Sequence, residues 1–164
     1  MIPRLPESKI GGVVRNRQAF MGMIAISELG PELIKVSDEG YNVLVGSTAK
    51  KPLIFRDYSD HPNVLNKALN STAAGPYQIL YKFWPHYKAQ LKLPDFGPIS
   101  QDLYCLQQLK ERRALDDIDA GRVREAIAKA NNIWASFTGS PYGQHTHPID
   151  YLVSAFETSG GTVA

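Results

Sequence analysis

The sequence has a single cysteine, Cys105, among its 164 residues, so no disulfide can form within the chain. It has no run of about 20 apolar residues, the length that a bilayer-spanning helix needs. Its first residues lack the apolar core of a secretory signal. There is also no cluster of Lys and Arg, and the formal net charge is only +2. These absences argue against membrane insertion and against nucleic-acid binding. We expect a protein made soluble in the cytoplasm that needs another agent to leave it.

Signature motifs for several kinds of chemistry are missing too. The chain has no G-x-S-x-G nucleophile elbow, no P-loop and no G-x-G-x-x-G, so neither a Ser-His-Asp triad nor nucleotide binding is expected. His145 and His147 form an H-x-H pair, whereas His61 and His86 are isolated. No Asp or Glu accompanies them at the spacing of a metal site. We therefore expect no metal and no other cofactor.

What the sequence does contain is an ordinary globular composition, 43% hydrophobic and 21% charged, at a length suited to one domain. Two prolines and Gly11-Gly12 indicate that residues 1–15 are a mobile lead-in, which leaves 16–164 as the folded domain. Alternating β-branched residues predict a strand at 41–46, with a return strand at 53–55. Apolar spacing predicts helices at 16–28, 77–91 (with a kink or a restart at Pro85), 101–115, 122–131 and 149–158. The pattern is that of an α+β domain, mostly helical, with one small β-hairpin.

The first predicted helix, residues 16–28 with Asn16 as its cap, is an apolar stretch that ends in one carboxylate. Glu28 lies four residues after Ile24 and seven after Met21, so a helix places all three on one face. If that face is buried, burial raises the pKa of Glu28 toward the range in which it can donate a proton. Glu is rarely buried, however, and the alternative is a solvated acid at the helix end. The stretch alone favours this second interpretation.

Several loops carry residue types that bind sugars, since aromatic rings suit the apolar faces of sugar rings and amides suit hydroxyl and N-acetyl groups. The candidates are Tyr58, Tyr77, Trp84, Tyr142, Asn42, Gln78 and Gln144. Taken singly, each is more often structural, and the helical spacing of Tyr81 and Trp84 favours core positions for both. The sugar hypothesis therefore depends on the other motifs of the chain.

Seven motifs follow one another along the chain after the first fifteen or so residues. They are Ile26-Ser27-Glu28, Gly40-Tyr41-Asn42-Val43-Leu44-Val45-Gly46, Asp57-Tyr58-Ser59-Asp60-His61-Pro62, Ser71-Thr72-Ala73-Ala74-Gly75-Pro76-Tyr77-Gln78, Gln107-Gln108-Leu109-Lys110-Glu111-Arg112, Asn132-Ile133-Trp134-Ala135-Ser136 and Tyr142-Gly143-Gln144. In this order the chain resembles the lambda-type phage endolysins, a family of peptidoglycan lytic transglycosylases. Seven collinear motifs are far more specific than any one of them.

The resemblance implies a lysozyme-like catalytic domain over residues 16–164, with a small β-lobe and with Glu28 as its single catalytic acid. The substrate it implies is the glycan strand of bacterial peptidoglycan. The bond cut is the β-1,4 link from N-acetylmuramic acid to N-acetylglucosamine, and the product carries a 1,6-anhydro ring. The residues carried over as substrate-binding are Ser27, Tyr41, Asn42, Asp57, Tyr58, Gly75, Tyr77, Gln78, Tyr142 and Gln144. The implied setting is a monomer that stays in the host cytoplasm until a holin-made hole releases it to the cell wall.

The chain departs from the family pattern at a few positions. Asn42 stands where one member of the family has an acid after the tyrosine, and Pro76 replaces a basic residue. The missing acid favours a mechanism with one carboxylate, because a hydrolase of the usual kind uses two. A hydrolytic muramidase with Asp57 or Asp60 as its second carboxylate remains an alternative. A non-catalytic peptidoglycan-binding module is another, against which the retained Glu28 argues.

Overall fold

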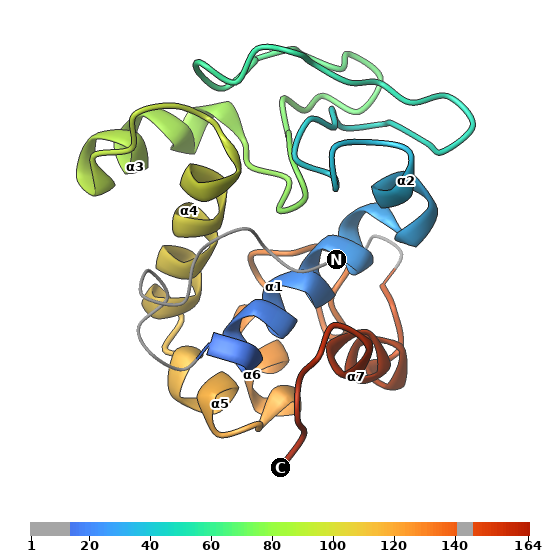
Figure 1. Ribbon diagram of the computed structural model, residues 1–164, viewed down its shortest axis with the longest axis vertical. Helices are drawn as coiled ribbons and strands as arrows, with labels where there is room; N and C mark the ends of the chain where they lie inside the picture. The colour runs from blue at the N-terminus through green and yellow to red at the C-terminus, as the bar shows by residue number, and fades with distance from the viewer. Residues whose placement is uncertain (1–13, 141–145) are drawn as a thin grey trace.

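Helices make up nearly all of the regular structure in the computed structural model, which describes residues 14–140 and 146–164 (Figure 1). Within these ranges the elements are α1 (Val14–Leu29), α2 (Pro31–Lys35), the 3₁₀ helix η2 (Tyr81–Phe83), α3 (Trp84–Leu91), α4 (Pro98–Glu111), α5 (Leu115–Asp119), α6 (Val123–Ala130) and α7 (Ile149–Thr158). The mostly helical architecture expected from the sequence is confirmed. None of the helices described here is long and apolar enough to cross a membrane.

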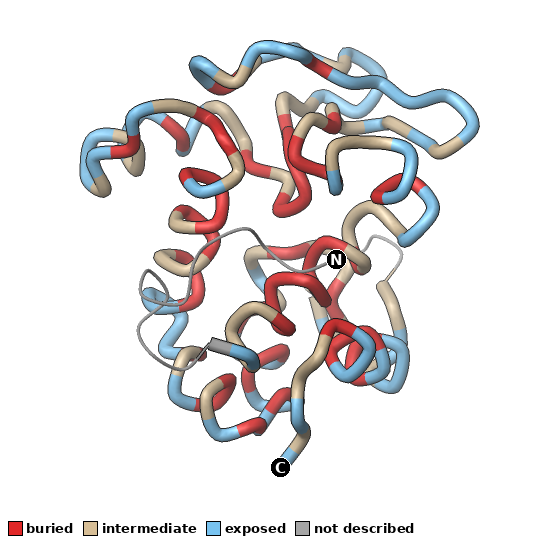
Figure 2. Tube along the Cα trace, in the orientation of Figure 1, coloured by how far each residue is buried: buried red, intermediate tan, exposed pale blue. Residues whose placement is uncertain are grey.

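The first helix, α1, runs through the centre of the molecule, with α5 and α7 packed against it (Figure 1). Its residues from Ala19 to Ala25 are all buried, so the helix has no polar face over nearly two turns (Figure 2). Such a helix belongs inside a core. The ring of Phe20 meets those of Phe137 and Phe156 edge to face, with centroids 6.2 and 6.5 Å apart. This packing fixes the direction of α1 and therefore the place where it ends.

Polar side chains near the start of α1 join it to α5 and to the C-terminal segment. The guanidinium of Arg17 meets the carboxylate of Asp119 with two parallel contacts of 2.7 Å, the bidentate geometry that makes such pairs specific. The side-chain oxygen of Asn16 accepts a hydrogen bond from the backbone N–H of Thr162 at 3.0 Å. Since α1 is already helical at Val14, the prediction of Asn16 as N-cap is wrong. Its amide instead holds two distant segments together.

Prolines begin three of the helices rather than interrupt them. Pro31, Pro85 and Pro98 each lie in the first turn of a helix, where the missing N–H has no intrahelical partner to lose. Of the two outcomes expected at Pro85, a kink or a restart, the structure shows the restart, because α3 begins at Trp84 with Pro85 in its first turn. The predicted helix is wrong only at its start, since residues 77–80 are not helical. The next predicted helix, 101–115, is observed as α4, which begins at Pro98 and ends at Glu111. Arg113, whose φ is 58°, separates α4 from α5.

Residues 36–80 form a layer of irregular chain at the top of the view in Figure 1. The predicted antiparallel pairing is present only in pieces. The N–H of Leu44 donates to the carbonyl of Leu53 at 2.9 Å, and Val43 forms an isolated bridge with Ile54. Because each bridge stands alone, the described residues contain no β-strand, and the predicted β-hairpin lobe is not confirmed.

Turns on both sides of this pairing keep it short. The N–H of Tyr41 bonds back to the carbonyl of Asp38, and Gly46, with φ of 85°, turns the chain away again. Leu53 and Ile54 are both exposed on the return segment (Figure 2 shows the exposure of this layer). A longer ladder would therefore bury little apolar surface, which is what normally stabilises a strand.

Candidate active site

Glu28 lies in the last turn of α1, where the buried part of the helix reaches the irregular layer. Its side chain is only partly exposed, and burial raises its pKa from 4.5 to about 7, while a hydrogen bond from the Ser136 hydroxyl acts in the opposite direction. The interpretation of Glu28 as a solvated acid at a helix end is therefore wrong. Gly30 ends the helix at once: its φ of 80° and ψ of 151° suit glycine, and α2 follows directly.

Ser136 and His147 contact Ser27, the residue that precedes Glu28. The hydroxyls of Ser27 and Ser136 share a short hydrogen bond, although they are 109 residues apart in the chain. The Nε2 atom of His147 lies 3.0 Å from the carbonyl oxygen of Ser27. The backbone N–H of His147 donates to the carbonyl of Ser136 at 2.9 Å. The ring of His147 stacks on Tyr151 of α7, with centroids 4.3 Å apart. The end of α1 is thus held by Ser136, which precedes residues 141–145 in the chain, and by His147, which follows them.

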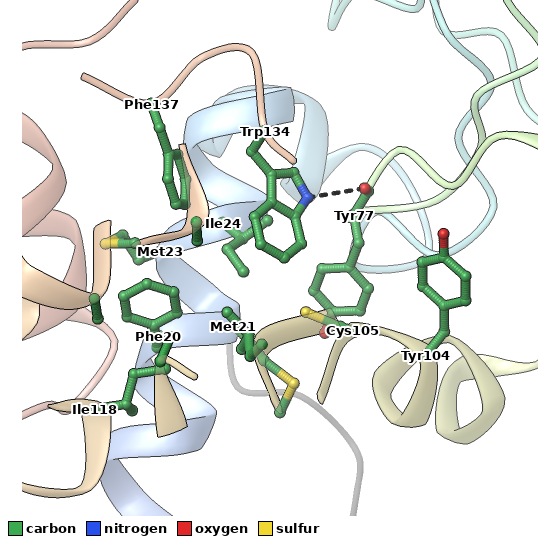
Figure 3. Packing of buried hydrophobic residues seen from close by; sticks show 14 of the residues in the cluster. Phe20, Met21, Met23, Ile24, Tyr77, Tyr104, Cys105, Ile118, Trp134 and Phe137 are labelled. Atoms are coloured by element: carbon green, nitrogen blue, oxygen red, sulfur yellow. Dashed lines mark hydrogen bonds between the residues drawn. The ribbon is translucent and has the colours of Figure 1, made fainter. Parts of the chain in front are cut away.

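A second carboxylate, Asp102 of α4, is fully buried beneath the irregular layer. Its Oδ1 accepts hydrogen bonds from the hydroxyls of Tyr41 at 2.9 Å and Tyr77 at 2.5 Å. Burial, with the nearby charge of Asp102, raises the pKa of Tyr77 well above its ordinary value, so its hydroxyl stays a donor. The indole N–H of Trp134 donates to the carbonyl of Tyr77 at 3.1 Å (Figure 3). This network joins α4, the irregular layer and the segment that leads to Ser136.

The burial of Tyr41 and Tyr77 bears on their expected role in substrate binding. Tyr41 is 0% and Tyr77 2% exposed, and both hydroxyls are engaged by Asp102, so neither side chain faces solvent where a glycan could touch it. Both instead position the segments on which they lie. Trp84, 1% exposed, is likewise the core residue that its helical spacing predicts.

Gly75 and Gln78 belong to one tight turn. Gly75 has φ of 78°, and a Cβ at this position would collide with Oε1 of Gln101 on α4. The amide of Gln101 donates to the carbonyl of Tyr41 at 3.1 Å, so this contact ties two loops to the helix. Gln78 has φ of 50°, is partly exposed, and donates from Nε2 to the carbonyl of Gly75 at 2.9 Å. Gly75 is therefore required because a side chain would not fit there, whereas Gln78 is partly exposed to solvent.

Asn42 and Tyr58, two further residues expected to bind substrate, both bond to Asp38. The side-chain oxygen of Asn42 accepts from the N–H of Asp38 at 3.0 Å, and the hydroxyl of Tyr58 donates to its carboxylate at 2.7 Å. Both side chains are partly exposed. Their recorded contacts stabilise the turn that follows α2.

The two acids considered as helpers for a hydrolase also have local partners. Asp57 is exposed and accepts from the N–H of Ser59 at 2.8 Å, and hydrogen bonds from Ser59 lower its pKa. Asp60 accepts from the indole of Trp84 at 2.8 Å and lies 3.2 Å from the ammonium of Lys88. Burial tends to raise the pKa of Asp60, but these donors outweigh it and lower the value.

Tyr142, Gln144 and His145 lie outside the described residues, so the structure does not bear on the roles expected for them. Among the residues that are described, no three His, Cys, Asp or Glu side chains gather in a group that could hold a metal ion. Sequence reasoning did not single out Ser136 or Asp102. Ser136 closes one of the seven motifs, but nothing in its residue type indicates that it meets the end of α1.

Comparison with known proteins agrees with this arrangement. A family model described as Endolysin matches residues 18–163. The chain is 48% identical over 158 residues to the endolysin of Escherichia phage P2, with 92% of this chain and 96% of that protein covered. It is also 48% identical over 153 residues to the endolysin of Escherichia phage lambda, with coverage of 90% and 93%.

Solved structures give the same result. The structure of bacteriophage lambda lysozyme complexed with a chitohexasaccharide superimposes with a TM-score of 0.82 at 46% identity, covering 92% of this chain and 97% of that one. A second structure of lysozyme from bacteriophage lambda gives 0.79 at 45% identity, with the same coverage. The fold is therefore lysozyme-like, and the protein is a peptidoglycan-cleaving enzyme. The chain belongs to the endolysin family.

Proposed function

We propose that this endolysin cuts the β-1,4 bond between N-acetylmuramic acid and N-acetylglucosamine by lytic transglycosylation, with Glu28 as its one acid and base. The observation that carries the proposal is the Glu28 carboxyl, whose pKa burial raises to about 7. Near neutral pH such a group is present in both forms, so it can give up a proton in one step and take one in the next.

Glu28 in its protonated form donates to the glycosidic oxygen as the bond from C1 of the muramic acid to that oxygen breaks. The resulting carboxylate then accepts the proton of the C6 hydroxyl of the same sugar while O6 bonds to C1. The ring closes as a 1,6-anhydro sugar, no water is consumed, and Glu28 is protonated again. The intramolecular attack gains from proximity, because the nucleophile is already attached to the reacting sugar.

The surroundings of the other acids support a mechanism with one carboxylate. A pair of carboxylates that share a site raise one another's pKa through their charges, whereas the rise at Glu28 comes from burial. Asp60 is held by Trp84 and Lys88, and Asp57 is exposed and bonded to Ser59. The amide of Asn42, at the position where one member of the family has an acid, accepts from the backbone of Asp38.

The solved relative in complex with a chitohexasaccharide supports a glycan as the substrate of this chain. Gln78, partly exposed, is a candidate contact for it, and Tyr142 and Gln144 stay predictions. We further propose that the protein acts as a monomer and remains in the host cytoplasm until a holin opens the way to the wall.

Mass spectrometry of digested glycan strands tests the reaction. Purified peptidoglycan is cut with the enzyme in H₂¹⁸O, and the muramic acid ends are weighed. Transglycosylation gives ends that lack one water and carry no ¹⁸O. Reducing ends that contain ¹⁸O would support a hydrolytic muramidase instead, with Asp57 as the acid to substitute next. Undigested strands that remain bound would indicate a non-catalytic module.

A further inference from the structure

The carbonyl of Ser27 has no helical partner, because of the residues that follow it. In a continuous α-helix it would accept from the backbone N–H of the residue four positions later. That residue is Pro31, which has no N–H, and Gly30, with φ of 80°, has already turned the chain out of the helix. Ser27 is 5% exposed, so solvent reaches it little. A buried carbonyl at a helix end needs a donor, and this one must find it outside α1.

The imidazole of His147 supplies that donor. Its Nε2 atom lies 3.0 Å from the carbonyl oxygen of Ser27, which is 120 residues earlier in the chain. A carbonyl oxygen can only accept, so Nε2 carries the proton of the neutral ring, and it also carries one in the charged ring. The contact is therefore kept in both protonation states. His147 replaces, from a distant segment, the donor that Pro31 lacks.

The backbone at His147 is held without the help of its ring. Its N–H donates to the carbonyl of Ser136 at 2.9 Å, and its carbonyl accepts from the hydroxyl of Thr138 at 2.5 Å. The ring stacks on Tyr151 of α7, with centroids 4.3 Å apart and planes inclined by 17°. Helix α7 in turn packs against α1. The donor is thus presented from a fixed support, and a change of the ring should leave the chain around it in place.

The peptide unit that His147 holds is the one that leads into Glu28. Its atoms from the Cα of Ser27 to the Cα of Glu28 lie in one plane, so fixing the carbonyl oxygen restrains the direction in which the Glu28 side chain leaves α1. The hydroxyl of Ser27, a residue expected to bind substrate, bonds to that of Ser136 and restrains the same turn. These restraints act where the helix itself offers few, because α1 ends one residue after Glu28.

We infer that His147 is a positioning residue for the catalytic acid: its Nε2–H, bonded to the carbonyl of Ser27, fixes the orientation of Glu28 for proton transfer to the glycan. The inference deepens the proposed function and rests on it. A general acid must lie within hydrogen-bond distance of the oxygen that it protonates, and a displacement of about 1 Å can lower the rate by about 100-fold. Loss of the donor should therefore affect turnover more than substrate affinity.

The test compares His147→Phe, which keeps an aromatic ring for Tyr151 but has no donor, with His147→Gln, whose Nε2 can donate. His86→Phe is the matched control, because His86 is an exposed histidine whose ring also meets a tyrosine, at a centroid distance of 5.0 Å. Both kcat and KM are measured on purified glycan strands well below the unfolding temperature. In His147→Phe, kcat should fall at least about tenfold with KM nearly unchanged. His147→Gln should recover most of kcat, and His86→Phe should change neither constant.

The ¹³C shift of the Ser27 carbonyl measures the contact without depending on catalysis. It should move in His147→Phe and return toward the wild-type value in His147→Gln. A folded His147→Phe protein with wild-type kcat, or with an unmoved Ser27 shift, would overturn the inference, because a purely structural role lowers stability and leaves turnover of the folded protein unchanged. If His147→Phe does not fold, His147→Leu takes its place, and wild-type turnover of that variant would be equally contradictory.

The Glu28→Gln variant separates this inference from the proposed function. If Glu28→Gln is inactive while His147→Phe turns over as the wild type does, the positioning role is wrong and the role of Glu28 stands. If Glu28→Gln still cuts glycan, the role of Glu28 is refuted, and the positioning role with it.

Discussion

Asp102 and Glu28 are two carboxylic acids that folding shields from water, and their surroundings differ. Asp102, in the middle of α4, is fully buried and receives two tyrosine hydroxyls on one oxygen. Glu28, at the end of α1, is partly exposed, and burial raises its pKa to about 7. The first acid thus has two donors from the irregular layer, whereas burial dominates the surroundings of the second.

The difference separates a structural acid from a chemical one. A buried carboxylate with several donors is stabilised by them and in turn fixes the groups that donate. A carboxyl with few donors keeps both protonation states within reach, which general acid and base catalysis needs. Burial alone therefore does not identify a catalytic acid, and the number of donors that compensate for it decides. The predictions below test this distinction.

The largest expected effect on stability belongs to Asp102→Ala. The change strands the hydroxyls of Tyr41 and Tyr77 in the core and leaves a cavity, so the free energy of unfolding should fall by about 4 kcal/mol. Urea or guanidinium unfolding measures it. Asp102→Asn keeps an oxygen that can accept both bonds and should cost about 1–2 kcal/mol. A loss below 1 kcal/mol for the alanine variant would mean that this acid is not structural.

A smaller loss is expected for Gly75→Ala, which tests the loop that lies against Gln101 beside Asp102. Both the positive φ of 78° and the collision with Gln101 oppose a side chain, so the free energy of unfolding should fall by about 3 kcal/mol. Gly30→Ala is the matched control: its φ is 80°, but a Cβ there meets nothing within 4 Å. It should cost only the backbone strain, about 1–2 kcal/mol. If Gly75→Ala and Gly30→Ala lower the free energy of unfolding equally, the collision with Gln101 does not contribute to the loss.

The smallest effect concerns His61, a buried imidazole whose two nitrogens are both bonded. Nδ1 accepts from the N–H of Asn63 at 2.9 Å, so Nε2 carries the proton and donates to the carbonyl of Ile79 at 2.7 Å. Burial lowers the pKa of His61 below 6.5. The unfolded chain therefore binds a proton that the folded chain does not, and stability should fall as pH drops from about 6.5 toward the folded pKa.

The unfolding midpoint in denaturant, followed from pH 7.5 to 5, measures this effect. Glu28 acts in the opposite direction over the same range, since its raised pKa makes stability fall as pH rises from 4.5 to about 7. The slope is therefore best measured in Glu28→Gln protein. His61→Gln in that background should flatten it, and an unchanged slope would show that His61 does not titrate in this range.

The sequence predicted those parts of the molecule whose structure is determined by residues close together in the chain. The apolar run from Ala19 to Ala25 predicted α1, and the spacing at 149–158 predicted α7 with the observed bounds. The acid at the end of α1 was found because the seven motifs were considered together. Whether its pKa is raised could not be decided from the sequence, because that depends on burial in the folded protein.

The failures have long-range causes too. The burial of Tyr41 and Tyr77 was not predicted, and only the position of Asp102, contributed by α4, shows why their hydroxyls turn inward. The strand pattern at 41–46 was real, but the turns that flank it limit pairing to single bridges. Residue type does not reveal Ser136 either, since a serine in an aromatic motif has no chemistry until α1 lies against it.

The most direct test of the central claim is Glu28→Gln, assayed for clearing of purified cell walls. The amide cannot donate or accept the proton, so the rate should fall by at least ~100-fold. The free energy of unfolding at pH 8 should not fall and is expected to rise by about 1–3 kcal/mol, because the variant no longer buries a charge. Loss of activity with that gain in stability is the predicted result. A variant that clears walls as fast as the wild type would contradict the account.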